Sequence, residues 1–122
     1  MNYCYPLMKD WVDYIDRKDG ERGEKHYLFD FGFHFGDWLA LDGATPTSFK
    51  GSTEDTYIAS VYYCESVRKT AEIAETLGLT EDAAHYRKLE EKIRQAVLAE
   101  YFTPNGRLAV TTQAAYVIAL KF

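Results

Sequence analysis

The segment TYIASVYYC, residues 56–64, contains no charged side chain, although 27% of the 122-residue chain is charged. Apolar and small residues continue beyond it at steps of three and four, which is the spacing of one face of an α-helix. That face consists of Tyr57, Val61, Cys64, Val67, Ala71 and Ala74, widened by Ile58, Tyr62 and Ile73. Ser52 or Thr53 can cap the start of this helix, and Gly78 is typical of its end. An uncharged segment of this kind predicts a helix in the interior of an all-α fold.

Three further helices are predicted from the same periodicity. The first covers residues 3–18, and Gly20 and Gly23 end it. Its apolar stripe consists of Cys4, Leu7, Met8, Trp11 and Ile15. The third helix covers residues 81–100, is capped by Thr80, and has a charged outer face over a buried one. That buried face consists of Tyr86, Leu89, Ile93 and Val97. The fourth helix begins near Thr111 or Thr112 and continues through the uncharged residues 113–120.

Charge divides these helices into outer and inner ones, which alternate along the chain. In antiparallel neighbours, the connections that precede inner helices emerge at the same end, so we expect the loop 19–53 and the turn 102–110 on one rim. The last helix has no Gly, Asn or Pro stop and is apolar all around, which is typical of a helix inside a larger body. We therefore predict antiparallel helical hairpins and expect residues 1–122 to be one all-helical segment of a larger domain.

Composition excludes several classes of function. A net charge of −5 argues against nucleic-acid binding, which needs clustered Lys and Arg. No apolar run approaches the roughly 18 residues of a membrane span, and no export signal opens the chain, which indicates a soluble protein and favours the cytoplasm. Cys4 and Cys64 fit no metal or redox spacing and are expected to be buried small hydrophobes that do not fix the compartment. With His26, His34 and His85 equally without metal-ligand spacing, no metal or cofactor is indicated.

The segment FGDWLALDGATPTSFKGSTED, residues 35–55, lies in a connection far longer than compact domains usually contain. Its aromatic residues argue against a disordered linker. From the residues alone, Trp38 is typical of a core side chain and Asp37 of a turn acceptor, although both could also contact a ligand. His34 could line a cleft or pack the loop. Gln113, at the start of an inner helix, either faces the cleft or bonds a neighbouring loop.

The order of the segments resembles that of bacterial α-L-rhamnosidases. The resemblance is carried by Met-Lys-x-Trp-Val-Asp-Tyr at residues 8–14, Gly-Asp-Trp-Leu-Ala at 36–40, Ile-Ala-Glu-Thr-Leu-Gly at 73–78, Asp-Ala-Ala-x-Tyr at 82–86 and Thr-Gln-Ala-Ala-Tyr at 112–116. It covers nearly the whole chain and aligns with an interior stretch of the family's catalytic domain. That domain is a ring of six helical hairpins, an (α/α)6 toroid, and the resemblance implies that this chain is part of one.

The resemblance implies hydrolysis of terminal α-L-rhamnose with inversion, which needs a carboxylic acid and a carboxylate about 6.5–9.5 Å apart. In the family the acid precedes the matching stretch and the base follows it, so neither is carried over, and Glu21 is not assigned as the acid. The matching Gly36, Asp37 and Trp38 imply contacts to a rhamnose-containing carbohydrate. Trp38 would offer an apolar plate, Asp37 hydrogen-bond acceptors and Gly36 close backbone approach. The segment alone is expected to be inactive.

Two alternatives follow from the same pattern. A partial ring exposes an apolar inner surface, so the chain could be a non-catalytic helical module that binds a saccharide or another helical protein, or that self-associates through its exposed inner helices. A different inverting enzyme on the same ring, such as a glucosidase or a hydrolase of unsaturated uronides, would also fit.

Overall fold

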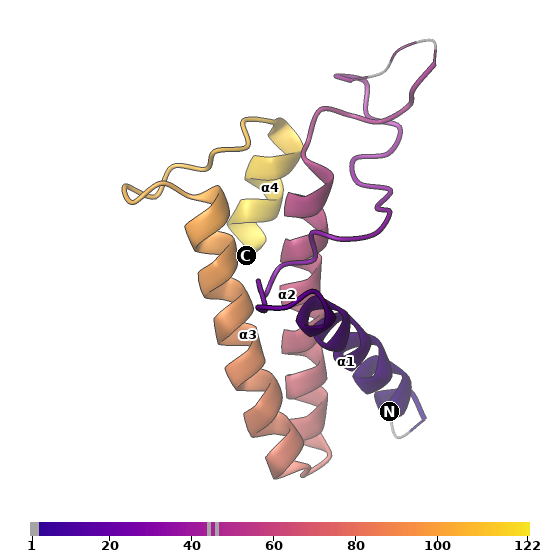
Figure 1. Cartoon of the computed structure of the whole chain (residues 1–122), viewed down its shortest axis with the longest axis vertical. Coiled ribbons are helices and arrows are strands. Elements are labelled where there is room, and N and C mark those ends of the chain that lie inside the picture. Colours follow the sequence, from indigo (N-terminus) through magenta and orange to yellow (C-terminus); the bar gives the residue numbers. More distant parts are fainter. Residues whose placement is uncertain (1–2, 44, 46) are drawn as a thin grey trace.

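The computed structural model describes residues 3–43, 45 and 47–122 and consists of four helices (Figure 1). These are α1 (Tyr5–Glu21), α2 (Asp55–Thr76), α3 (Thr80–Tyr101) and α4 (Gln113–Lys121). The described residues form three isolated β-bridges and no strand. None of the four helices, within these described ranges, is both long and apolar enough to cross a membrane. The predicted all-α class is confirmed.

Helix α2 is central, since α1, α3 and α4 all lie against it. In Figure 1, α2 and α3 run side by side, α4 lies beside their upper part, and α1 crosses α2 lower down. The faces predicted for α2 and α3 meet in the core and are confirmed, except that Tyr62 is 54% exposed. Their buried apolar residues include Tyr57, Val61, Cys64, Val67, Ala71, Ala74, Tyr86, Leu89, Ile93 and Val97.

The turn between α2 and α3 has the geometry that its glycine predicts. Gly78 lies at φ +73°, a left-handed conformation that glycine adopts without steric cost. Its amide donates to the carbonyl of Glu75 at 3.1 Å, and the amide of Leu79 donates to that of Ala74 at 2.9 Å. This pair of bonds is a Schellman motif, which satisfies carbonyls at the helix end and reverses the chain into an antiparallel hairpin.

Helix α1 departs from the predicted stripe. Its buried residues include Val12 and Ile15, whereas Leu7 is 71% exposed and Trp11 is 51% exposed. The predicted burial of Cys4 is wrong as well, while that of Cys64 is confirmed. The helix carries apolar residues on two faces, and only the face with Val12 and Ile15 packs against the core. Periodicity alone cannot tell which of two apolar faces meets a partner.

Only one of the predicted caps is confirmed. Thr112 is the N-cap of α4 and accepts a hydrogen bond from the amide of Ala115 at 3.2 Å. Residues Glu54 and Leu79 occupy the N-cap positions of α2 and α3 without side-chain capping bonds, so Thr53 and Thr80 do not serve as caps. The Thr53 hydroxyl is instead used in a long-range contact described below.

The exposed apolar surface of the predicted inner helices belongs mainly to α4. Its residues Tyr116, Val117 and Leu120 are exposed, whereas most of residues 56–64 on α2 are buried, with Tyr62 as the main exception.

Candidate functional site

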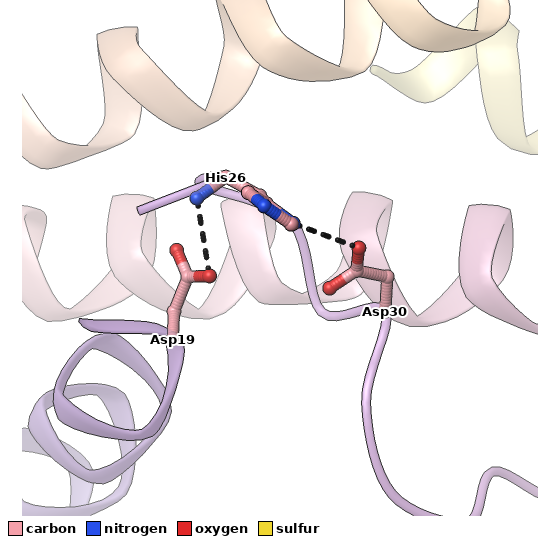
Figure 2. Close-up of side chains that lie close together, drawn as sticks. All are labelled: Asp19, His26 and Asp30. Carbon is pink, nitrogen blue, oxygen red and sulfur yellow. Dashed lines mark hydrogen bonds and ion pairs between the residues drawn. The ribbon is translucent and has the colours of Figure 1, made fainter. Parts of the chain in front are cut away.

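The loop between α1 and α2 carries the residues singled out by the sequence, and polar contacts hold its beginning. Asp19, in the last turn of α1, is almost fully buried. Its carboxylate accepts hydrogen bonds from the backbone amide of His26 at 3.1 Å and from that of Tyr27 at 2.7 Å. Figure 2 shows the first of these contacts and the neighbouring pair of His26 and Asp30. The buried carboxylate therefore ties the start of the loop to the end of the helix.

A guanidinium group completes this anchor. The Nη2 atom of Arg22 lies 2.6 Å from Asp19 Oδ1 and 2.6 Å from Asp30 Oδ1. The Nδ1 atom of His26 lies 3.3 Å from Asp30 Oδ2. Burial alone would raise the pKa of Asp30, but the bonds from Arg22 and His26 outweigh it and hold that pKa below its usual value. This charged network favours one loop conformation.

The same cluster is the candidate for metal binding. Ligand-type atoms of Asp19, His26 and Asp30 all lie within 4.8 Å of one another. Arg22, however, already pairs with both carboxylates, so the protein itself balances their charge. The donor set therefore fits a loop anchor better than a cation site. The sequence did not indicate this anchor, because residues 17–25 (RKDGERGEK) alternate in sign like a solvated turn.

Glycine is required at position 36 by its surroundings. Gly36 has φ +62°, and a Cβ atom there would overlap the carboxylate of Asp55. That carboxylate forms an ion pair with Lys50, whose Nζ atom also donates to the carbonyl of His34 at 3.1 Å. The close approach of the loop backbone to the first turn of α2 thus depends on the missing side chain.

Asp37 is joined to the start of α4 by a short relay of hydroxyl groups. Thr53 Oγ1 donates to Asp37 Oδ2 at 2.7 Å and lies 2.7 Å from Thr112 Oγ1. A hydroxyl has one proton, so Thr112 must donate to Thr53 while accepting from the amide of Ala115. The Gly-Asp-Trp segment therefore lies beside the start of the last helix, which agrees with the expectation that the loop 19–53 and the turn 102–110 share one rim.

Trp38 lies at the surface of the loop. It is 48% exposed, so the core interpretation of this residue is wrong. Its ring meets that of Phe35 edge to face at 5.7 Å, and Phe35 in turn meets Phe33 at 5.2 Å. The backbone beside it is held by the amide of Leu39, which donates to the carbonyl of Phe49 at 2.7 Å. The indole is therefore both accessible and held in place.

The remaining candidates lie around this loop. His34 contacts the ring of Phe29 at 4.5 Å between ring centres, so it packs the loop as well as lining a groove. Gln113 is exposed at the start of α4. Glu21 is exposed and bonds Lys18 at 2.7 Å, and this hydrogen bond lowers the pKa of Glu21. A general acid needs the opposite shift.

Comparison with known proteins identifies relatives over the whole chain. The family model described as the bacterial alpha-L-rhamnosidase 6 hairpin glycosidase domain matches residues 1–122. The chain is 30% identical over 122 residues to an alpha-L-rhamnosidase of Alteromonas sp. (strain LOR), covering 97% of this chain and 13% of that protein. It is 31% identical over 117 residues to an alpha-L-rhamnosidase of Streptomyces avermitilis, covering 95% of this chain and 10% of that protein.

A solved structure agrees with these relatives. The crystal structure of native α-L-rhamnosidase from Aspergillus terreus superposes with a TM-score of 0.83 at 27% identity, over 98% of this chain and 13% of that one. The chain thus spans between 10% and 13% of the length of the relatives that it matches.

Proposed function

We propose that this chain forms part of the sugar-binding cleft of an inverting glycoside hydrolase. The premise is that the chain belongs to the family of bacterial α-L-rhamnosidase six-hairpin glycosidase domains. In this proposal residues 1–122 are one segment of a larger helical ring. The substrate is a rhamnose-containing carbohydrate, and the residues that contact it are Gly36, Asp37 and Trp38.

One observation carries the proposal: the relay from Thr112 through Thr53 to Asp37, with the exposed Trp38 next to it. The relay brings a loop carboxylate and the start of a helix 75 residues further along the chain to one place. Binding sites in helical folds are built by such loops on a rigid scaffold.

The chemistry of these side chains suits a neutral sugar. The exposed indole of Trp38 offers an apolar face for the C–H bonds and the methyl group of a deoxyhexose. Among the described residues, the hydrogen bond to the Asp37 carboxylate is made at Oδ2, so Oδ1 is left to accept from a sugar hydroxyl. The carboxylate of Asp55 lies where a Cβ atom of residue 36 would be, so glycine lets the segment approach α2 closely.

We propose further that the segment lacks the proton-transfer pair. Glu21, the one carboxyl group that a superficial motif match suggests, has a lowered pKa and pairs with Lys18. Incubation of this chain with a chromogenic α-L-rhamnoside should therefore release no product. Turnover above the buffer rate would show that two of these 122 residues act as acid and base.

Sugar binding can be tested by titrating the ¹⁵N-labelled chain with methyl α-L-rhamnoside. The chain contains two tryptophans, so the two indole N–H signals of Trp11 and Trp38 are separable by substitution. The Trp38 signal should shift and saturate, and Asp37→Asn should weaken binding severalfold. Methyl α-D-glucoside is the control sugar. A Trp38 signal that responds to neither sugar, or equally to both, would contradict the proposed specificity.

A second candidate is favoured by the exposed apolar residues of α4. Tyr116, Val117 and Leu120 form a patch that a ring neighbour or another copy of the chain would cover. In the non-catalytic alternative the chain self-associates through this surface. Light scattering should then give a concentration-dependent mass, and Leu120→Lys should return it to that of a monomer. A monomer at all concentrations would eliminate this candidate.

A further inference from the structure

A row of carboxylates lies along α1 beside its buried apolar residues. Asp13, Asp16 and Asp19 follow one another at steps of three residues, so neighbours in the row lie on the same side of the helix. Next to them in the sequence, Val12 and Ile15 are buried in the core. The contact between α1 and the hairpin is therefore partly polar, and each buried oxygen in it needs a hydrogen-bond partner.

The row differs in how its oxygens are satisfied. Tyr86 on α3 donates to Asp13 Oδ1 at 2.7 Å. The carboxylate of Asp19 is bound by the two loop amides and the guanidinium group described above. Asp16 pairs through Oδ2 with Lys25 Nζ at 2.5 Å, but its Oδ1 atom is buried and has no hydrogen-bond partner within residues 3–43, 45 and 47–122.

Tyr63 on α2 brings a second buried polar atom to this row. Its side chain is only 2% exposed, and its hydroxyl group has no hydrogen-bond partner in the part of the chain that the structure describes. Burial raises the pKa of Tyr63, and the negative charge of Asp16 raises it further, more than any other charge does. Because electrostatic effects weaken with distance, the phenol lies near the row and Asp16 acts on it most strongly. The raised pKa keeps the phenol protonated and able to donate.

The two atoms have complementary hydrogen-bonding capacity. The Tyr63 hydroxyl has a proton to donate, and Asp16 Oδ1 has lone pairs that accept. No direct hydrogen bond joins them. A water molecule both accepts and donates, and buried waters in proteins typically bond polar groups that would otherwise be unsatisfied. One molecule between the two side chains would therefore satisfy both.

The charges around these atoms favour a neutral ligand. The carboxylate of Asp16 is paired with Lys25, and that of Asp19 is paired with Arg22. A cation would add a surplus positive charge beside Lys25 and would meet the hydroxyl proton of Tyr63. An anion would face the row of carboxylates. A small neutral molecule that can donate and accept meets neither obstacle.

We propose that Tyr63 and Asp16 form a binding site for one water molecule, which accepts a hydrogen bond from the Tyr63 hydroxyl and donates one to Asp16 Oδ1. The water joins α1 to α2 one helical turn before Asp19, and so helps to fix the place where the loop begins. This site does not depend on sugar binding, so its test is independent of the proposed function.

The sign of the stability change in Tyr63→Phe tests the site. Phenylalanine keeps the buried ring and removes only the hydroxyl group. Loss of a hydroxyl without a partner should leave stability unchanged or raise it, whereas loss of one that is bonded to water should increase the equilibrium constant for unfolding about three- to tenfold. Urea denaturation followed by circular dichroism gives this constant. An unchanged or smaller constant would overturn the inference.

Two backgrounds identify the partner of Tyr63. In Asp16→Ala the water has lost its acceptor, so the added Tyr63→Phe change should have less than half of its effect in the unmodified chain. Asp13→Ala is the matched control, because Asp13 belongs to the same row but its Oδ1 atom is bonded to Tyr86. In that background Tyr63→Phe should keep its full effect. Equal effects in the two backgrounds would contradict the pairing with Asp16.

Occupancy of the site can be tested without any variant. A high-resolution crystal structure of the chain should show one water within about 3.2 Å of both Tyr63 Oη and Asp16 Oδ1. Replacing sodium chloride by potassium or choline chloride at equal ionic strength should leave the urea midpoint unchanged. A direct bond between Tyr63 and Asp16, a gap without density, or stabilisation by one cation alone would each overturn the inference.

Discussion

The α2–α3 hairpin and the loop of residues 22–54 are stabilised in different ways. The hairpin buries apolar faces that contact each other along two long helices. The loop leaves many of its aromatic rings exposed and is held by polar anchors, Asp19 with Arg22 at one end and Asp37 with Thr53 at the other. Polar anchoring can therefore hold the loop while its aromatic rings stay exposed.

The largest effect should follow from a change in the hairpin core. Ile93 is fully buried among the residues shared by α2 and α3. Ile93→Ala should lower the free energy of unfolding by about 2–5 kcal/mol, because it removes buried methyl groups and leaves a cavity. Urea denaturation followed by circular dichroism measures this loss.

The matched control is Leu41→Ala in the loop, where the side chain is almost fully exposed. Its effect should stay within about 0.5 kcal/mol. If the two variants lost similar stability, the loop would have to pack its apolar side chains as the hairpin does, and the contrast between the two regions would be wrong.

The hairpin is also the part of the fold that sequence could predict. Its periodic apolar faces and the glycine at position 78 are local signals, and each led to the observed structure. In α1 the same reasoning misassigned Leu7 and Trp11, since this helix has two apolar faces. The (α/α)6 assignment came from the order of motifs and not from periodicity, which has no information about closure into a ring.

The second largest loss of stability should follow from a change at Thr53, which anchors the end of the loop through Asp37. Thr53→Val keeps the shape of a fully buried side chain but removes the hydroxyl between Asp37 and Thr112. We expect a loss of about 1–3 kcal/mol, the usual cost of leaving a buried polar partner unsatisfied. Hydrogen exchange should show faster opening at the amides of Leu39 and Gly51, which lie beside this anchor.

Thr47→Val serves as the control, because Thr47 is an exposed threonine of the same loop. It should change neither stability nor exchange at those amides. Uniform acceleration of exchange across α2 and α3 in Thr53→Val would show that the relay supports the whole fold and not the loop alone.

The site was only partly predictable, because several of its contacts join residues far apart in the sequence. Gly36, Asp37 and Trp38 were predicted from a motif and stay a prediction, whereas the Thr53 hydroxyl looked like a helix cap and is part of the relay. Its actual partners lie 16 and 59 residues away. The Asp19 anchor was missed, because two of its partners are backbone amides that carry no sequence signature and its third, Arg22, lies in a run of alternating charge. Long-range polar contacts follow from the tertiary arrangement and leave no local pattern.

Two glycines of the loop allow the effect of the close approach between residue 36 and Asp55 to be separated from that of backbone strain. Gly32 and Gly36 both have positive φ, at +81° and +62°. Substitution by alanine should cost about 1–2 kcal/mol at either position from backbone strain alone. At Gly36 the added Cβ must also displace Asp55, whereas at Gly32 no atom lies within 4 Å. Only Gly36→Ala should therefore change the fluorescence of Trp38, and equal spectra would mean that the contact with Asp55 does not position the loop.

The smallest effect on stability should come from the Asp30 carboxylate, which pairs with Arg22 at the start of the loop. The folded state lowers its pKa, so its contribution to stability is present above the unfolded value of about 3.9 and is lost as the pH falls through the folded value. Asp30→Asn removes this proton linkage. The free energy of unfolding should then differ from that of the unmodified chain by less than about 1 kcal/mol at pH 7, since the pair with Arg22 is partly exposed, and the two curves should converge as the pH falls below the folded pKa of Asp30. Asp30 belongs to the polar network of the loop and not to the core of the hairpin. Its protonation should therefore perturb the backbone amides around His26 at a higher pH than those of α3. If the amides of α3 responded first, the acid-sensitive part of the molecule would be the hairpin, and the polar network would not be what holds the loop.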